Sequence, residues 1–145
     1  MATTVDTHLA SDVRVAIGRL ARRLRQEGAK GQLTASQLSA LFSVEHLAPV
    51  RLVDLAAAEA IAPPSLTRTI TALEEAGLVT RTADADDRRC ARITLTAAGR
   101  VRLRRIRSER TAWLQRRLDS LSAADRALLA DALPVLTALV DEGEK

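Results

Sequence analysis

The sequence predicts a mainly α-helical fold with one small β-hairpin, and three observations predict it. Alanine, leucine and arginine dominate the chain, and these residue types favour helices. β-Branched residues, which favour strands, are sparse outside one short stretch, residues 78–95. Apolar residues recur at helical spacing through most of the chain, whereas part of that stretch alternates between apolar and polar residues.

The composition excludes several classes of protein. The 145 residues are 47% apolar and 28% charged, as in an ordinary globular domain, and the net charge of +4 permits a polyanionic partner. Phe42 and Trp113 are the only aromatic residues, which argues against base-stacking platforms for single-stranded nucleic acid. One cysteine and two histidines argue against a disulfide and a metal site, and we expect no cofactor. With no membrane-length apolar run and no export signal, we expect a cytoplasmic protein that does not bind membranes.

Capping residues, prolines and glycines mark the ends of six expected helices. Thr34 and Gln37 have the spacing of a capping box, two prolines open the fourth helix, and Gly77 follows its end. The helices are expected at about residues 6–27, 34–46, 51–58, 63–76, 97–118 and 122–142, the first ending at Gly28 to Gly31. The two strands of the hairpin are expected at residues 78–82 and 90–95.

The fourth helix has two contrasting faces. On a helical wheel, Leu66, Ile70 and Leu73 share one side and are expected to face the core. The other side suits a DNA major groove, because arginine can pair with guanine and hydroxyl groups can bond base edges or phosphates. A merely solvated face is the alternative, although solvent faces elsewhere in this chain carry many charges. The expected DNA-contacting residues of this helix are Ser65, Thr67, Arg68 and Thr71.

The loop of the hairpin is rich in aspartate and arginine over residues 84–89. The short third helix, a short turn and the fourth helix have the helix-turn-helix arrangement, and the hairpin follows directly. As the wing of this helix-turn-helix, the loop could place Arg88 or Arg89 in a narrow minor groove, with Asp87 holding a neighbouring arginine. A solvated turn whose charges pair weakly is the alternative. The helix N-terminus at Thr34 and the side chain of Arg51 could contact phosphates.

Three segments in order resemble the MarR family of multiple antibiotic resistance regulators. They are Leu73 to Arg81, Asp87 to Arg89, and Leu95 to Gly99, although the family's usual wing proline is replaced by Ala83 or Ala85. The resemblance implies a winged helix-turn-helix with N- and C-terminal dimerisation helices. Residues 1–33 would be the N-terminal dimerisation helix, 34–96 the DNA-binding lobe and 97–145 the C-terminal dimerisation helices, intertwined as a single domain.

The resemblance also implies a function. We expect a non-enzymatic, sequence-specific regulator of transcription that binds double-stranded DNA, acting as a repressor released by a small-molecule ligand. A homodimer would read a pseudo-palindromic site, and the long apolar stripes of the first, fifth and sixth helices independently favour an interface. Family members often bind small aromatic or lipophilic compounds between the DNA-binding lobe and the dimer helices. Phe42, His46 and Trp113 are the candidate lining here.

Two other functions stay open at this point. The chain could be a regulator-like dimer that acts through a protein partner, or it could sense oxidants through Cys90. Relatives that sense peroxides typically do so through a cysteine in the N-terminal helix, where this chain has none. An enzyme is not expected, because no set of nucleophile, base and orienting group is visible.

Overall fold

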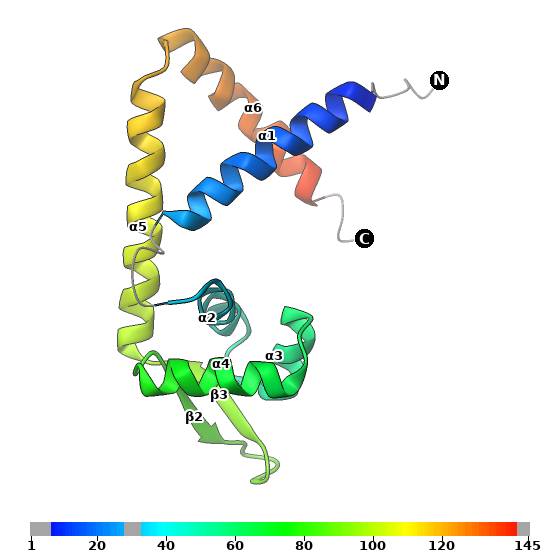
Figure 1. Ribbon diagram of the computed structural model, residues 1–145, viewed down its shortest axis with the longest axis vertical. Helices are drawn as coiled ribbons and strands as arrows, with labels where there is room; N and C mark the ends of the chain where they lie inside the picture. Colours follow the sequence, from blue (N-terminus) through cyan, green and yellow to red (C-terminus); the bar gives the residue numbers. More distant parts are fainter. Residues whose placement is uncertain (1–6, 28–32, 142–145) are drawn as a thin grey trace. The chain divides into compact units, whose positions relative to one another are not determined.

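The computed structural model describes residues 7–27 and 33–141 (Figure 1). The chain divides into two compact units, Met1–Arg110 and Thr111–Lys145. The described residues form six helices and a small antiparallel sheet, which confirms the predicted fold class. The elements are α1 (Thr7–Gln26), α2 (Ala35–Leu47), β1 (Val50–Arg51), α3 (Leu52–Glu59), α4 (Pro63–Glu75), β2 (Val79–Ala83), β3 (Ala91–Leu95), α5 (Ala97–Asp119) and α6 (Ala123–Asp141). The expected helix limits at Asp6, Gly28 to Gly31 and Glu142 lie outside the described residues.

The sheet has three strands, in the order β1-β3-β2. Strands β2 and β3 form the predicted antiparallel hairpin, and β1 is a third strand that sequence analysis missed. Val50 of β1 pairs with Ile93, and Arg51 pairs with Arg92. A strand of two residues is too short to show alternation, and sequence analysis therefore assigned Arg51 to the third helix. The pairing joins the start of α3 to the returning strand of the hairpin.

Helices α2, α3 and α4 pack with the sheet and the first part of α5 around one core. Leu66, Ile70 and Leu73 have no exposed surface, as the helical wheel predicted. Pro63 and Pro64 form the first turn of α4, and Gly77 follows its end with a φ of 72°, a conformation that glycine adopts without steric cost. The polar side of α4 therefore faces outward.

The hairpin is held close to the first turn of α5. A Cβ atom on Gly99 would lie 2.1 Å from the carbonyl oxygen of Leu78, so only glycine permits this approach. The hydroxyl of Thr96 caps α5 by accepting from the amide of Gly99 at 3.0 Å, and it donates to the carbonyl of Gly77. These contacts fix where the hairpin leaves the lobe.

Neither α1 nor α6 buries a single residue completely within the chain. Leu128 and Leu139 of α6 are 67% and 64% exposed, and Ile17 and Leu20 of α1 are also exposed. None of the helices in the described part of the chain is long and apolar enough to cross a membrane. Among the described residues, the apolar faces of α1 and of α6 are thus largely exposed.

Candidate nucleic-acid interface

Helices α3 and α4 form a helix-turn-helix, with Ala60 in the left-handed conformation, φ 52°, in the turn between them. Ser65, Thr67 and Arg68 are exposed on α4, whereas Thr71 is half-buried. No described residue pairs with the guanidinium of Arg68. The structure therefore brings the four predicted residues of α4 onto its outward side.

Two hydroxyl groups on this side already make hydrogen bonds. These bonds determine whether each hydroxyl can still donate to DNA or accept from it. Thr67 Oγ1 donates to the carbonyl of Pro63 at 2.9 Å, so its proton is used and lone pairs remain to accept. Thr71 Oγ1 accepts from Arg81 Nη2 at 3.1 Å, so its proton remains available to donate. Arg81 Nε also lies 3.4 Å from a carboxylate oxygen of Glu74. Sequence analysis missed Arg81, because no local spacing shows that β2 returns beside the last turns of α4.

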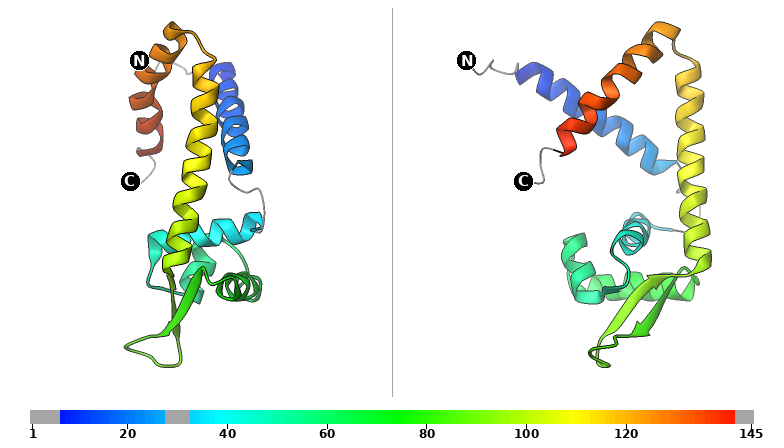
Figure 2. Two further views of the ribbon diagram at one scale, coloured as in Figure 1. Left: turned by 90° about the vertical axis from the view of Figure 1, so that its left-hand side faces the viewer. Right: turned by 180° about the vertical axis from the view of Figure 1, so that it is seen from behind.

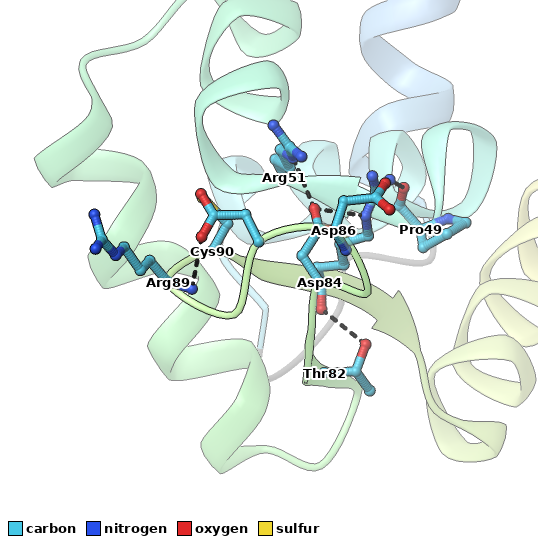
Figure 3. A network of polar contacts seen from close by, with 9 residues as sticks. Pro49, Arg51, Thr82, Asp84, Asp86, Arg89 and Cys90 are labelled. Carbon is cyan, nitrogen blue, oxygen red and sulfur yellow. Dashed lines mark hydrogen bonds and ion pairs between the residues drawn. The ribbon is translucent and has the colours of Figure 1, made fainter.

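The base of the wing contains a buried carboxylate, that of Asp84, which is 1% exposed (Figure 3). One of its oxygens accepts from Arg51 Nε at 2.8 Å and from Arg92 Nε at 3.0 Å. The other accepts from the amide of Asp86 at 3.0 Å. Arg92 Nη1 also donates to the carbonyl of Pro49 at 3.2 Å. We call Asp84, Arg51 and Arg92 the wing clasp.

These donors stabilise the charged form of the carboxylate. The amide of Asp86, together with Arg51 and Arg92, lowers the pKa of Asp84 from 3.8 to about 2, against the opposing effect of burial. The same contact with Asp84 raises the pKa of Arg51. Asp84 is therefore ionised throughout the physiological pH range.

Asp87 contacts its neighbour Arg89, as sequence analysis expected, but it does so through the backbone and not through the guanidinium. Asp87 accepts from the backbone amide of Arg89 at 3.0 Å and lies 3.6 Å from Cys90 Sγ. Sequence order alone could not show which aspartate of the loop points inward. Arg88 and Arg89 are exposed, and within the described ranges no carboxylate pairs with either guanidinium. The loop acids thus leave both wing cations unneutralised.

A cavity of about 380 Å³ is lined by residues of the wing and of the helix-turn-helix. Arg51, Arg81 and Arg89 line it together with Cys90, which is half-buried, and with apolar side chains. Three guanidinium groups around one hollow attract anions such as DNA phosphates. In the part of the chain that the structure describes, no group of three or more His, Cys, Asp or Glu could hold a metal ion.

Thr34 has both of its capping-box bonds. Its hydroxyl accepts from the amide of Gln37 at 3.2 Å, and its own amide donates to Gln37 Oε1 at 2.8 Å. This confirms the predicted cap. The expected phosphate contact at Thr34 stays a prediction, and it would need the other free amides of the first turn of α2.

Phe42 and His46 line a second cavity, of about 520 Å³, formed by residues of α1, α2 and α5. Trp113 does not line this cavity and instead has Arg117 5.4 Å from its ring centroid. The remaining lining is partly cationic, which sequence analysis missed because the cations come from two distant helices. The cationic lining residues are Arg22, Arg25 and Arg110.

Arg110 is the least solvated of these cations. Its guanidinium carbon lies 5.3 Å from the centroid of the Phe42 ring, and its Nε donates to the carbonyl of Glu27 at 3.3 Å. Burial, followed by repulsion from Arg25 and Arg107, lowers the pKa of Arg110. The charge of Arg107 is balanced by Glu45, with which it makes a two-pronged ion pair.

Comparison with known proteins identifies the family. A model of the MarR family matches residues 33–91. An uncharacterized HTH-type transcriptional regulator of Mycobacterium bovis is 35% identical over 137 residues, which cover 94% of this chain and 96% of the relative. The chain belongs to the MarR family. It is therefore a transcriptional regulator with a DNA-binding helix-turn-helix, and this membership supports the expectation that it is not an enzyme.

Solved structures agree with the MarR fold. A Pseudomonas aeruginosa protein is 37% identical with a TM-score of 0.81, over 96% of this chain and 99% of that protein. A mutant of Staphylococcus aureus MepR, solved bound to an oligodeoxyribonucleotide, is 22% identical with a TM-score of 0.69, over 90% of this chain and 97% of MepR. The predicted winged helix-turn-helix of this MarR-family chain is confirmed.

The low pKa of Asp84 predicts a defined dependence of stability on pH. Because the folded pKa lies below the unfolded value, the charged carboxylate stabilises the fold fully above about pH 4, and this is lost as the pH falls through about 2. We expect the difference in unfolding free energy between wild type and Asp84→Asn to be constant near neutrality and to shrink in that window. Chemical denaturation across pH measures it. A difference that does not change down to about pH 2 would contradict an ionised, buried Asp84.

Proposed function

We propose that the protein is a cytoplasmic, homodimeric repressor that binds a pseudo-palindromic site in double-stranded DNA and is released by a small anionic ligand. The single observation that carries the DNA-binding mode is the exposed polar side of α4 beside a wing whose arginines are unneutralised. The wing extends beyond α4 in each view of the lobe (Figures 1 and 2). The family resemblance supports the repressor role.

The chemistry of α4 fits a major groove. Arg68 has no ion-pair partner among the described residues and can donate two parallel hydrogen bonds to guanine, while Thr67 can accept and Thr71 can donate. Ser65, near the N-terminus of α4, lies where recognition helices meet base edges. Beside α4, Arg88 and Arg89 would lie in the minor groove, and Arg51 would face the phosphates.

The apolar faces of α1 and α6 support a dimer. Monomers rarely leave large contiguous apolar surfaces in water, and in this chain both helices are without a fully buried residue. In this proposal residues 1–33 and 97–145 form the interface and residues 34–96 the DNA-binding lobe. Two-fold symmetry then presents two α4 helices to two half-sites.

The cavity that contains Phe42 and His46 supports an anionic, partly apolar ligand. Its cations outnumber its acids, and burial, followed by repulsion from Arg25 and Arg107, lowers the pKa of Arg110. A small aromatic carboxylate would relieve that repulsion and pack against Phe42. Since the cavity lies against α2, on which α4 packs, an occupant there could shift the DNA-binding helices.

Arg68→Ala tests recognition by α4. We expect a loss of about 1–3 kcal/mol in binding to a duplex selected by the wild type from a randomised pool, with relaxed base preference at one position in each half-site. Quantitative gel shift with selected and random duplexes measures both. Arg105→Ala, which removes the same charge from an exposed residue of α5, is the matched control and should keep the base preference. Wild type that selects no duplex would instead favour the protein-partner alternative.

Replacing Arg88 and Arg89 together by alanine tests the wing. A minor-groove contact is mainly electrostatic, so binding to selected and random duplexes should weaken alike. The plot of log affinity against log salt should flatten by about 0.9 for each phosphate no longer neutralised. An unchanged affinity and salt slope would refute a wing contact.

Substituting two exposed leucines of α6 tests the dimer. Leu128→Glu combined with Leu139→Glu would leave a monomer undisturbed but would bury charge in the proposed interface, so we expect dissociation and weaker DNA binding. Sedimentation velocity measures the mass, and Asp131→Asn on the same helix is the control. A stable dimer in the double variant would rule out α6 as the interface.

Benzoate tests the ligand proposal, with benzyl alcohol as its uncharged counterpart. We expect benzoate to bind and to displace fluorescent duplex. Arg110→Gln should weaken benzoate binding by about tenfold or more, because it removes one charge-assisted hydrogen bond in a partly desolvated site. Calorimetric titration measures it. Equal binding of benzyl alcohol, or no effect of Arg110→Gln, would contradict an anion site at this cavity.

A further inference from the structure

We propose that Asp84 is a positioning residue for DNA binding: its buried carboxylate holds the wing against the helix-turn-helix through Arg51 and Arg92. This inference rests on the proposed function and assigns a role to an acid within a surface that binds a polyanion. Asp84 itself would not touch the DNA. It acts through the two arginines and through the backbone of the wing loop.

The wing clasp joins three separate parts of the lobe (Figure 3). Arg51 directly precedes α3, the first helix of the helix-turn-helix, and Arg92 lies on β3. Asp84 follows β2, and its second oxygen accepts from the amide of Asp86 within the wing loop. Arg92 extends the network to the carbonyl of Pro49, just before β1. The carboxylate of Asp84 thus connects the wing loop to β3 and to the start of the helix-turn-helix.

Burial distinguishes Asp84 from the other acids of the loop. Asp84 is 1% exposed, whereas Asp86 and Asp87 are exposed. A buried carboxylate is tolerated only when it is paired, and here two guanidinium groups leave the clasp with a net positive charge. The side chains of Arg51 and Arg92 stay 37% and 33% exposed, so each remains accessible from solvent.

The clasp also sets how Arg51 meets the DNA. Its Nε is taken by Asp84, and its two terminal nitrogens take no part in that contact. A guanidinium is planar, so fixing Nε restricts the directions in which the terminal N–H groups can point. Asp84 therefore orders both a predicted phosphate contact and the loop that carries Arg88 and Arg89.

The proposed role predicts a change in DNA affinity opposite in direction to the change expected from net charge alone. Removing an acid from a DNA-binding surface raises the net charge and by electrostatics alone should tighten binding to every sequence. If Asp84 positions the wing, removing its charge should weaken binding instead. The direction of the change separates a positioning residue from a negative charge that merely lies near the DNA.

Asp84→Asn and Asp86→Asn are the matched pair for the test. Both change the net charge equally, and the Asp86 side chain holds neither arginine of the clasp. With full-length protein and the duplex selected by the wild type, we expect Asp84→Asn to bind about tenfold or more weakly, with a salt slope flatter by about 0.9 for each lost phosphate contact. Asp86→Asn should bind as tightly as the wild type or more tightly. Equal or tighter binding by Asp84→Asn would overturn the proposal.

Arg92→Lys provides a second test that keeps the net charge. Lysine cannot reach both Asp84 and the carbonyl of Pro49 in the forked geometry of arginine, so binding should weaken and hydrogen exchange should quicken at the amides of residues 84–90. Both assays are run below the unfolding transition of each variant. Unchanged exchange and affinity in Arg92→Lys would also overturn the proposal. Failure of the wild type to select any duplex would instead refute the proposed function.

Discussion

The burial of one side of α4 is the constraint on which the DNA-binding surface depends. Leu66, Ile70 and Leu73 recur at helical spacing and are all fully buried. Burying each such side chain contributes about 1.5–3 kcal/mol, so rotation of α4 about its axis would be costly. With the helix fixed in this rotation, the hydroxyl groups and Arg68 must face outward. The two prolines and Gly77 then set the ends of the helix.

Sequence could predict what local patterns determine. The capping box at Thr34 and the inward stripe of α4 follow from spacings of three or four residues, and the structure confirms both. Contacts between distant residues could not be predicted in this way. The strand β1, the bond from Arg81 to Thr71 and the pairing of Asp84 with Arg51 join segments that no periodicity links. Sequence analysis therefore predicted residues of the candidate site but not the hydrogen bonds and ion pairs that connect them.

Arginines pair with a buried acid at the base of the wing, whereas the arginines at the cavity beside Phe42 outnumber its acids. At the wing, two arginines surround one buried acid, so the carboxylate is ionised and the contact holds parts of the fold together. At the cavity beside Phe42, arginines from α1 and α5 gather without an equal number of acids, and the pKa of Arg110 is lowered. The first arrangement is satisfied within the chain, whereas the second would be satisfied by an added anion. The same residue type thus serves structure at the wing and, in our proposal, ligand binding at the cavity.

Amide hydrogen exchange of the wild-type protein, with and without its selected duplex, tests directly whether α4 and the wing bind DNA. We expect new protection concentrated at residues 63–71 and 84–90, with weaker effects near Arg51. Protection confined to α1 and α6, or protection of α4 with none in the wing, would contradict this expectation.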